Sequence, residues 1–145
     1  MRSIFDETTS FEGVDFSEAD LSYAELQGAN LEGVRVKNSQ FNYANLARSS
    51  FRHARLETVD FSHARAHFSD FSHASLKGCF LAGSFVESVF YDADLLATTF
   101  ISGGAVAALQ RADFTGAKNV APDAFDGIPP DLLRDVAGIP PPPPP

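Results

Sequence analysis

The sequence predicts an all-β solenoid, and three observations carry that prediction. From Phe11 to Leu76, Phe, Leu or Val recurs every five residues at 13 of 14 positions, which we call centres. Two residues before each centre stands a small or β-branched residue, at what we call the small position. None of the nine prolines precedes Pro122, as expected where backbone amides are needed for hydrogen bonds between coils.

A strict period of five residues excludes an α-helix and an ordinary sheet over this stretch, because their side-chain periods are about 3.6 and 2 residues. Two apolar positions in every five predict a chain that turns a corner every five residues and directs both side chains into a narrow lumen. Coils stacked about 4.8 Å apart would satisfy their backbone groups by hydrogen bonds between coils. Each coil then contacts only its neighbours, which defines a solenoid.

Six units of the chain resemble the repeat of the pentapeptide-repeat family: ADLSY (19–23), AELQG (24–28), ANLEG (29–33), ANLAR (44–48), ADLLA (93–97) and ADFTG (112–116). The resemblance extends over residues 9–119. It implies a right-handed quadrilateral β-helix with four pentapeptides in each coil, so that residues 20 apart stack in columns. The chain would then form about five coils.

The period slips twice beyond Leu76. After a one-residue deletion, the predicted centres are Phe80, Phe85, Phe90, Leu95, Phe100 and Ala105. A second slip follows Gly103-Gly104, where we expect a bulge or a loosened corner. The last predicted centres are Leu109, Phe114 and Asn119.

The repeat is predicted to be flanked by a lead-in (1–8), a capping segment (120–138) and a polyproline tail (139–145). Within the capping segment, residues 129–138 predict a short C-terminal helix that begins near Pro130 and ends at Gly138. This helix would cover the last coil, whose edge otherwise exposes unpaired backbone groups. The tail is either an extended terminus without a partner or a ligand for an aromatic groove.

The composition restricts the classes of function. The chain has 145 residues and a formal net charge of −8, which argues against direct binding of nucleic acid. Its one cysteine, Cys79, excludes an intramolecular disulfide framework and fits a reducing compartment. The first ten residues lack an apolar signal core, and long apolar runs are absent. We therefore expect a cytoplasmic protein with no membrane partner.

Charge is distributed unevenly along the predicted rod. The net charge is −7, +4 and −5 in three successive segments, residues 1–32, 33–78 and 79–145. The middle segment is predicted to stack its charges in two columns, Arg35 with Arg55, and Lys37 with Glu57 and Lys77. These residues form either a solvated face with modest ion pairing or a patch for an acidic partner.

No catalytic, cofactor-binding or metal-binding constellation emerges from the sequence. Of the four histidines, only His53 and His73 share a predicted column, with Asp92 beyond them. Two imidazoles and one carboxylate are too few for a closed structural zinc site, so we expect a surface ladder of imidazoles and no metal. The serines lack the setting of a nucleophile, and a lumen filled by Phe and Leu leaves no pocket. We therefore expect a protein that is not an enzyme and needs no cofactor.

After the first slip, the outward position beside each centre changes from polar to apolar. Exposed apolar surfaces mark interfaces, and one short helix can shield only part of such a belt. We therefore expect a homodimer formed through the C-terminal coils. The expected interface consists of Leu81, Val86, Tyr91, Leu96, Ile101, Val106, Leu132, Leu133 and Val136.

The resemblance implies a function in protein binding. Some bacterial members of the family are acidic dimeric rods that mimic DNA, bind DNA gyrase or topoisomerase IV and confer quinolone resistance. In such a mimic, carboxylates stand in for phosphates, and the candidates are Glu12, Asp15, Glu18, Asp20, Glu25 and Glu32. The positive middle segment and the lack of inserted loops oppose this interpretation. The alternative is a general interaction scaffold or structural adaptor unrelated to topoisomerases.

Overall fold

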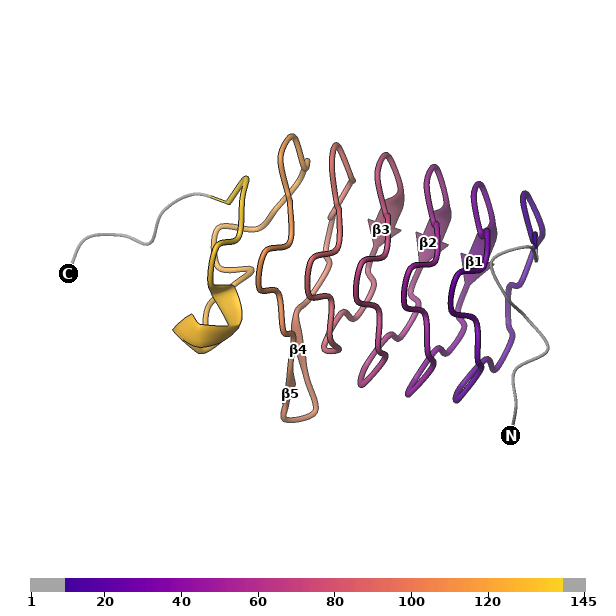
Figure 1. The fold of residues 1–145 in the computed structure, drawn as a ribbon, viewed down its shortest axis with the longest axis horizontal. Coiled ribbons are helices and arrows are strands. Elements are labelled where there is room, and N and C mark those ends of the chain that lie inside the picture. Colours follow the sequence, from indigo (N-terminus) through magenta and orange to yellow (C-terminus); the bar gives the residue numbers. More distant parts are fainter. Residues whose placement is uncertain (1–9, 140–145) are drawn as a thin grey trace.

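The computed structural model describes residues 10–139 as a rod of stacked coils (Figure 1). Parallel bridges join residues 20 positions apart, beginning with Ser10–Asn30, and they recur every five residues along the chain. A fold of the β-helix type is therefore confirmed. The predicted lead-in and residues 140–145 of the polyproline tail lie outside the described residues.

Regular strands are few because each side of a coil contributes only one to three bridging residues before the chain turns. The parallel sheet has the order β1-β2-β3, with β1 at Arg35–Lys37, β2 at Arg55–Glu57 and β3 at Ser75–Lys77. Its register pairs residues 20 apart. A second, antiparallel pair consists of β4 (Ile101–Ser102) and β5 (Ala105–Val106).

Each corner of the coil places a residue in the left-handed region of the backbone. Tyr43, His53 and His63, for example, have φ values of 61°, 59° and 61°. The Asp or Asn before a centre supports the corner, because its side-chain oxygen accepts a hydrogen bond from the backbone N–H two residues further on. Such turns are formed by Asp15, Asp20, Asn30, Asn45, Asp60, Asp70, Asp94 and Asp113. The recurring Asp or Asn of the repeat thus has a structural role.

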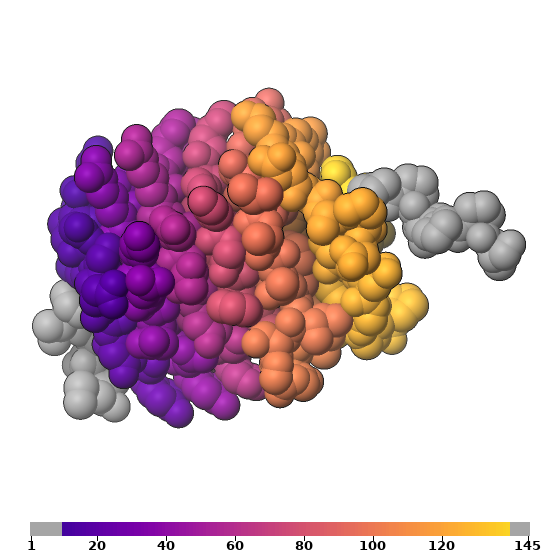
Figure 2. All heavy atoms as spheres, turned by 180° about the vertical axis from the view of Figure 1, so that it is seen from behind, coloured from indigo at the N-terminus to yellow at the C-terminus, as the bar shows by residue number. Residues whose placement is uncertain are grey.

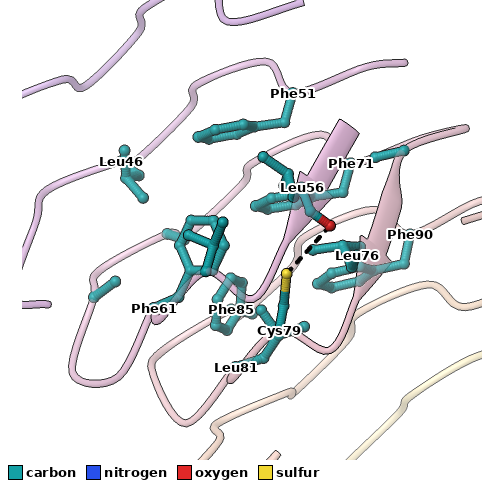
Figure 3. Packing of buried hydrophobic residues seen from close by; sticks show 14 of the residues in the cluster. Leu46, Phe51, Leu56, Phe61, Phe71, Leu76, Cys79, Leu81, Phe85 and Phe90 are labelled. Atoms are coloured by element: carbon teal, nitrogen blue, oxygen red, sulfur yellow. Dashed lines mark hydrogen bonds between the residues drawn. The ribbon is translucent and has the colours of Figure 1, made fainter. Parts of the chain in front are cut away.

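The lumen is filled by stacked phenylalanine rings (Figure 3). Phe51, Phe71, Phe90 and Phe114 form one column, with 4.8, 5.2 and 4.6 Å between successive ring centroids. Phe61 lies edge-on to this column, 6.0 Å from both Phe51 and Phe71. Stacked and edge-on arrangements are the favourable ones for aromatic rings. The predicted centres are fully buried from Leu26 to Leu76.

Polar residues at small positions donate hydrogen bonds to backbone carbonyls inside the rod. The Ser69 hydroxyl donates to the Leu46 carbonyl at 2.9 Å, and the Cys79 thiol to the Leu56 carbonyl at 3.5 Å (Figure 3). The other donors of this kind are Ser39, Ser49, Ser88 and Thr98. Burial raises the pKa of the Cys79 thiol to about 12, so Cys79 packs as a small apolar residue and is not a reactive thiolate.

The one-residue deletion lies one unit later than the sequence predicted. Phe80 bridges the residue 20 positions before it, whereas Ser84 bridges the residue 19 positions before it. Accordingly, Leu81 and Cys79 are buried, and Phe80 is 36% exposed. The predictions of Phe80 as a centre and of Leu81 as an outward residue are therefore wrong. The cause is local ambiguity, because Gly78 and Cys79 are both small and the next two residues are both large and apolar.

The second slip is an inserted hairpin and not a bulge or a loosened corner. Between β4 and β5, Gly103 and Gly104 have φ values of 56° and 85°. Positive φ at both central residues defines a tight hairpin turn of the kind that glycine favours. The hairpin extends beyond the outline of the neighbouring coils (Figure 1). The expectation that the repeat carries no inserted loop is therefore wrong.

The insertion changes the register of the last coil. The spacing of bridged residues grows from 19, as in Phe80–Thr99, to 24, as in Ser84–Ala108. The predicted centre at 105 lies in β5, and the repeat resumes with buried residues at 109 and 114, as predicted. Asn119, the last predicted centre, is exposed.

The C-terminal segment covers the end of the rod (Figure 2). Little of this segment is helical. Only η1 (Pro130–Leu133), a single 3-10 turn, is helical, so the helix predicted over 129–138 is wrong. The chain is extended at Arg134 and has positive φ at Asp135. The physical reason is competition for hydrogen bonds, since the Leu109 amide donates to the Leu132 carbonyl at 2.8 Å. The backbone of this segment pairs with the last coil instead of with itself.

Candidate protein-binding surfaces

The functional surfaces of this rod lie on its outside, because its lumen is packed with side chains. Within residues 10–139, no group of three or more His, Cys, Asp or Glu residues is arranged to hold a metal ion. No helix in the described part of the chain is long and apolar enough to cross a membrane. The outward columns are therefore the places to look for function.

The six carboxylates proposed for partner binding encircle the first coils and do not form one acidic face. Asp15, Asp20 and Glu25 lie on three separate columns of bridged residues. Glu12 and Glu32, 20 residues apart, stand next to each other on a fourth column, where the Gly13 amide donates to the Glu32 carbonyl at 3.0 Å. All but the half-buried Glu25 and Glu32 are exposed.

Several of these carboxylates have partners within the rod. Asp15 and Asp20 accept hydrogen bonds from the Ser17 and Ser22 amides at 2.8 and 3.0 Å. The serine hydroxyls, and then these amides, lower the pKa of both aspartates. Glu18 accepts a bond from an asparagine side chain of the next coil at 3.1 Å. Part of the acidity of the N-terminal coils thus supports the fold.

Large apolar side chains remain exposed on the C-terminal coils although the capping segment covers the end. Tyr91, Leu96 and Ile101 are 44%, 45% and 39% exposed. Val86 and Val106 of the predicted belt are half-buried. We call Tyr91, Leu96 and Ile101 the apolar belt from here on, since they are the predicted belt residues that the structure leaves exposed. They follow bridged residues of three separate columns, so the belt runs around the rod and is not a single face.

The three remaining predicted interface residues belong to the cap. Leu132, Leu133 and Val136 are half-buried and pack against the core of the rod. Phe125 of the same segment stacks on Phe100 with 4.9 Å between ring centroids. These side chains close the lumen of the rod, so they are less available to a partner than the apolar belt.

Exposed rings stack in two columns along the rod. His53 and His73 stack at 5.0 Å, as the 20-residue spacing predicted, and the Asp92 carboxylate lies 3.9 Å from His73 Nδ1. The second column was not predicted from the sequence. In it, Tyr43 stacks on Tyr23 at 5.1 Å and on a histidine of the next coil at 4.7 Å. The same 20-residue spacing could have revealed it.

One serine and one histidine lie within hydrogen-bonding distance. Ser84 Oγ is 2.7 Å from His67 Nε2, across neighbouring coils. A catalytic pair of this kind needs a third group that orients the imidazole and donors that stabilise an oxyanion. No such orienting carboxylate contacts His67 in the described part of the chain. The pair therefore satisfies two half-buried polar groups and does not define an active site.

The parallel sheet presents a positive surface. Arg35 and Lys37 of β1, Arg55 of β2 and Lys77 of β3 are exposed on it. They surround a shallow depression of about 460 Å³, to which Glu57 also contributes. The predicted stacking of Arg35 with Arg55, and of Lys37 with Glu57 and Lys77, is confirmed by the register of the sheet.

A rod of five-residue sides with a filled lumen and columns of stacked side chains on its outside defines a non-globular repeat protein of the solenoid class. The model of the pentapeptide repeat region matches residues 7–86. The chain belongs to the pentapeptide repeat family. No curated protein sequence matches it.

Several solved structures resemble the chain. Trypsin-treated QnrB1, a plasmid-mediated fluoroquinolone resistance protein, is 19% identical over 96% of this chain and 86% of its own, with a TM-score of 0.35. HetL, from the cyanobacterium Nostoc sp. strain PCC 7120 and involved in heterocyst differentiation regulation, is 15% identical over 80% and 76%, with a TM-score of 0.27. Rfr23 from the cyanobacterium Cyanothece 51142 is 14% identical over 90% and 80%, with a TM-score of 0.33. These likenesses concern the repeat architecture and assign no partner to this chain.

Proposed function

We propose that this protein is a non-catalytic protein-binding rod and that the apolar belt is its main binding surface. The observation that carries the proposal is that the side chains of Tyr91, Leu96 and Ile101 are each more than one third exposed. They remain exposed although side chains fill the lumen and the C-terminal segment covers the end of the rod. Exposed apolar side chains of this size are costly in water and are typical of interfaces. A rigid solenoid supports such a surface without reorganisation on binding.

The first partner that the belt predicts is a second copy of the chain. A symmetric pair would bury the same apolar side chains on both protomers. Light scattering at micromolar concentration should therefore give a mass about twice the 15.6 kDa of the chain. The double substitution Leu96→Ser and Ile101→Ser should give the monomer mass, because it removes the apolar contact but no core side chain.

The matched control for the dimer is Tyr23→Ser, which removes the most exposed aromatic ring, 70% exposed, from the first coil. This variant should remain dimeric. A monomer mass for the unaltered chain would contradict self-association, and so would a dimer of the double variant.

A second candidate function is mimicry of DNA toward DNA gyrase or topoisomerase IV. It is supported by Glu12 and Glu32, which occupy neighbouring positions on adjacent acidic N-terminal coils and could compete for a basic DNA-binding surface. The protein should then inhibit gyrase supercoiling at micromolar concentration. Inhibition should weaken by about tenfold in Glu12→Gln with Glu32→Gln, since each lost charge contact is worth about 0.5–1 kcal/mol.

The control for the supercoiling assay is Asp123→Asn with Asp126→Asn, which removes the same charge from exposed positions in the capping segment. This variant should inhibit like the unaltered chain. Absence of inhibition by the unaltered chain would remove the topoisomerase proposal and leave the general interaction scaffold.

A further inference from the structure

The parallel sheet gathers four cations that form no close salt bridge within residues 10–139. Arg35, Lys37, Arg55 and Lys77 surround its depression, and none of them forms a salt bridge with another residue in 10–139. Glu57 stands between the two lysines in its column. Asp15 also lines the depression, beside Arg35. The surface therefore holds four positive and two negative charges, and it keeps a net positive charge.

The pairing of Arg35 with Arg55 is unfavourable for the fold. The sheet register places the two residues directly opposite each other on neighbouring strands, and like charges in that position destabilise a sheet. Some arginines elsewhere on the rod form salt bridges, as in the Arg111–Glu87 bridge at 2.9 Å. A local arrangement of like charges that costs stability is typical of a functional site.

The positive surface is short and has an acidic residue on each side. The column of Arg35 and Arg55 begins at Asp15 and continues through Ser75 and Asp94 to Lys118. The cations thus span three neighbouring coils, shown as β1, β2 and β3 in Figure 1, or about 10 Å at the usual spacing between strands. A long polyanion such as duplex DNA would meet the acidic residues on both sides, whereas a short acidic segment would not.

We propose that the β1–β3 face is a second binding site, and that it docks a short extended acidic segment of a protein partner. Its carboxylates would lie between the paired guanidinium groups of Arg35 and Arg55 and near Lys77, where charge-assisted hydrogen bonds are strongest. A single compact dianion in the centre of the depression would face the Glu57 carboxylate and be repelled by it. Separate carboxylates along an extended peptide can contact the cations without facing Glu57. The site is independent of the apolar belt, so either proposal can fail without the other.

The test uses the full chain and a fluorescently labelled oligoglutamate peptide. Fluorescence anisotropy should show binding at low salt that weakens as salt is raised, because the contacts are exposed charges. The double variant Arg35→Gln with Arg55→Gln should bind the peptide about tenfold more weakly. Its thermal unfolding temperature should not fall, since the substitution removes a repulsion between opposite strands.

The charge-matched control is Arg48→Gln with Arg65→Gln, which lowers the net charge equally but lies on other columns. It should bind the peptide within about twofold of the unaltered chain. Equal weakening in both double variants would overturn the site, because binding would then follow net charge alone. Failure of the unaltered chain to bind oligoglutamate at low salt, or preferential binding of inorganic phosphate or duplex DNA, would also overturn it.

Discussion

Replacing Phe71 with alanine should lower the free energy of unfolding by about 3–5 kcal/mol. The Phe71 ring is fully buried and stacks between Phe51 at 4.8 Å and Phe90 at 5.2 Å. Two further rings, Phe61 and Phe85, lie edge-on or tilted to it at 6.0 and 5.9 Å. Coils held together by backbone bonds on every side cannot collapse around the void, so the cavity would persist. Urea-induced unfolding followed by circular dichroism measures the loss.

The control for Phe71 is Phe68→Ala, which removes the same ring from a corner where it is 50% exposed. The Phe68 ring contacts the Arg48 guanidinium at 5.6 Å, and its loss should cost less than about 1 kcal/mol. A similar loss in both variants would contradict the assignment of the phenylalanine column as the core of the rod.

Gly83→Ala should destabilise the rod by about 2–3 kcal/mol. A Cβ atom at Gly83 would lie 2.7 Å from the carbonyl oxygens of Phe61 and Ala64. These are backbone atoms of the preceding coil, so relief would require the two coils to separate and to weaken their shared hydrogen bonds. Gly83 lies within the one-residue deletion, between the bridged residues Phe80 and Ser84. The unfolding midpoint in urea at constant slope measures this change.

Gly103→Ala separates this steric effect from the ordinary cost of replacing glycine. No atom lies within 4 Å of a Cβ at Gly103, but its φ is positive. Its substitution should cost only about 1 kcal/mol, which is the conformational penalty of a turn position. If Gly83→Ala were no more damaging than Gly103→Ala, the close approach of the coils at the deletion would be contradicted.

The sequence was sufficient for the repeat because each five-residue side is locally encoded. The alternation of a small position and a large centre set which side chains enter the lumen from Leu26 to Leu76, and all of these centres are buried. The side chain of the Asp or Asn before a centre, such as Asp60 or Asp70, accepts a hydrogen bond from a backbone N–H of its own turn. Both signals lie within a few residues of each other and need no distant partner.

The outward placement of the predicted interface residues was correct in part, for the same reason. Tyr91, Leu96 and Ile101 were placed outward by their position beside a centre, and they are exposed. Leu81 was wrongly predicted to point outward, because the sequence is compatible with a one-residue deletion either before or after Leu81. The six acidic residues were grouped by their closeness in the sequence, whereas the coil distributes them over several columns.

The sequence by itself determined the five-residue side, the identity of the lumen residues and the large charge differences along the rod. Only the tertiary structure decided where the deletion falls, that the second slip is a hairpin, and that the C-terminal segment pairs with the last coil instead of forming a helix. It also placed Arg35 beside Arg55, and within residues 10–139 neither arginine forms a salt bridge. The physical reason is that a repeat is specified by local side chains, but its registration depends on hydrogen bonds and packing between coils about 20 residues apart.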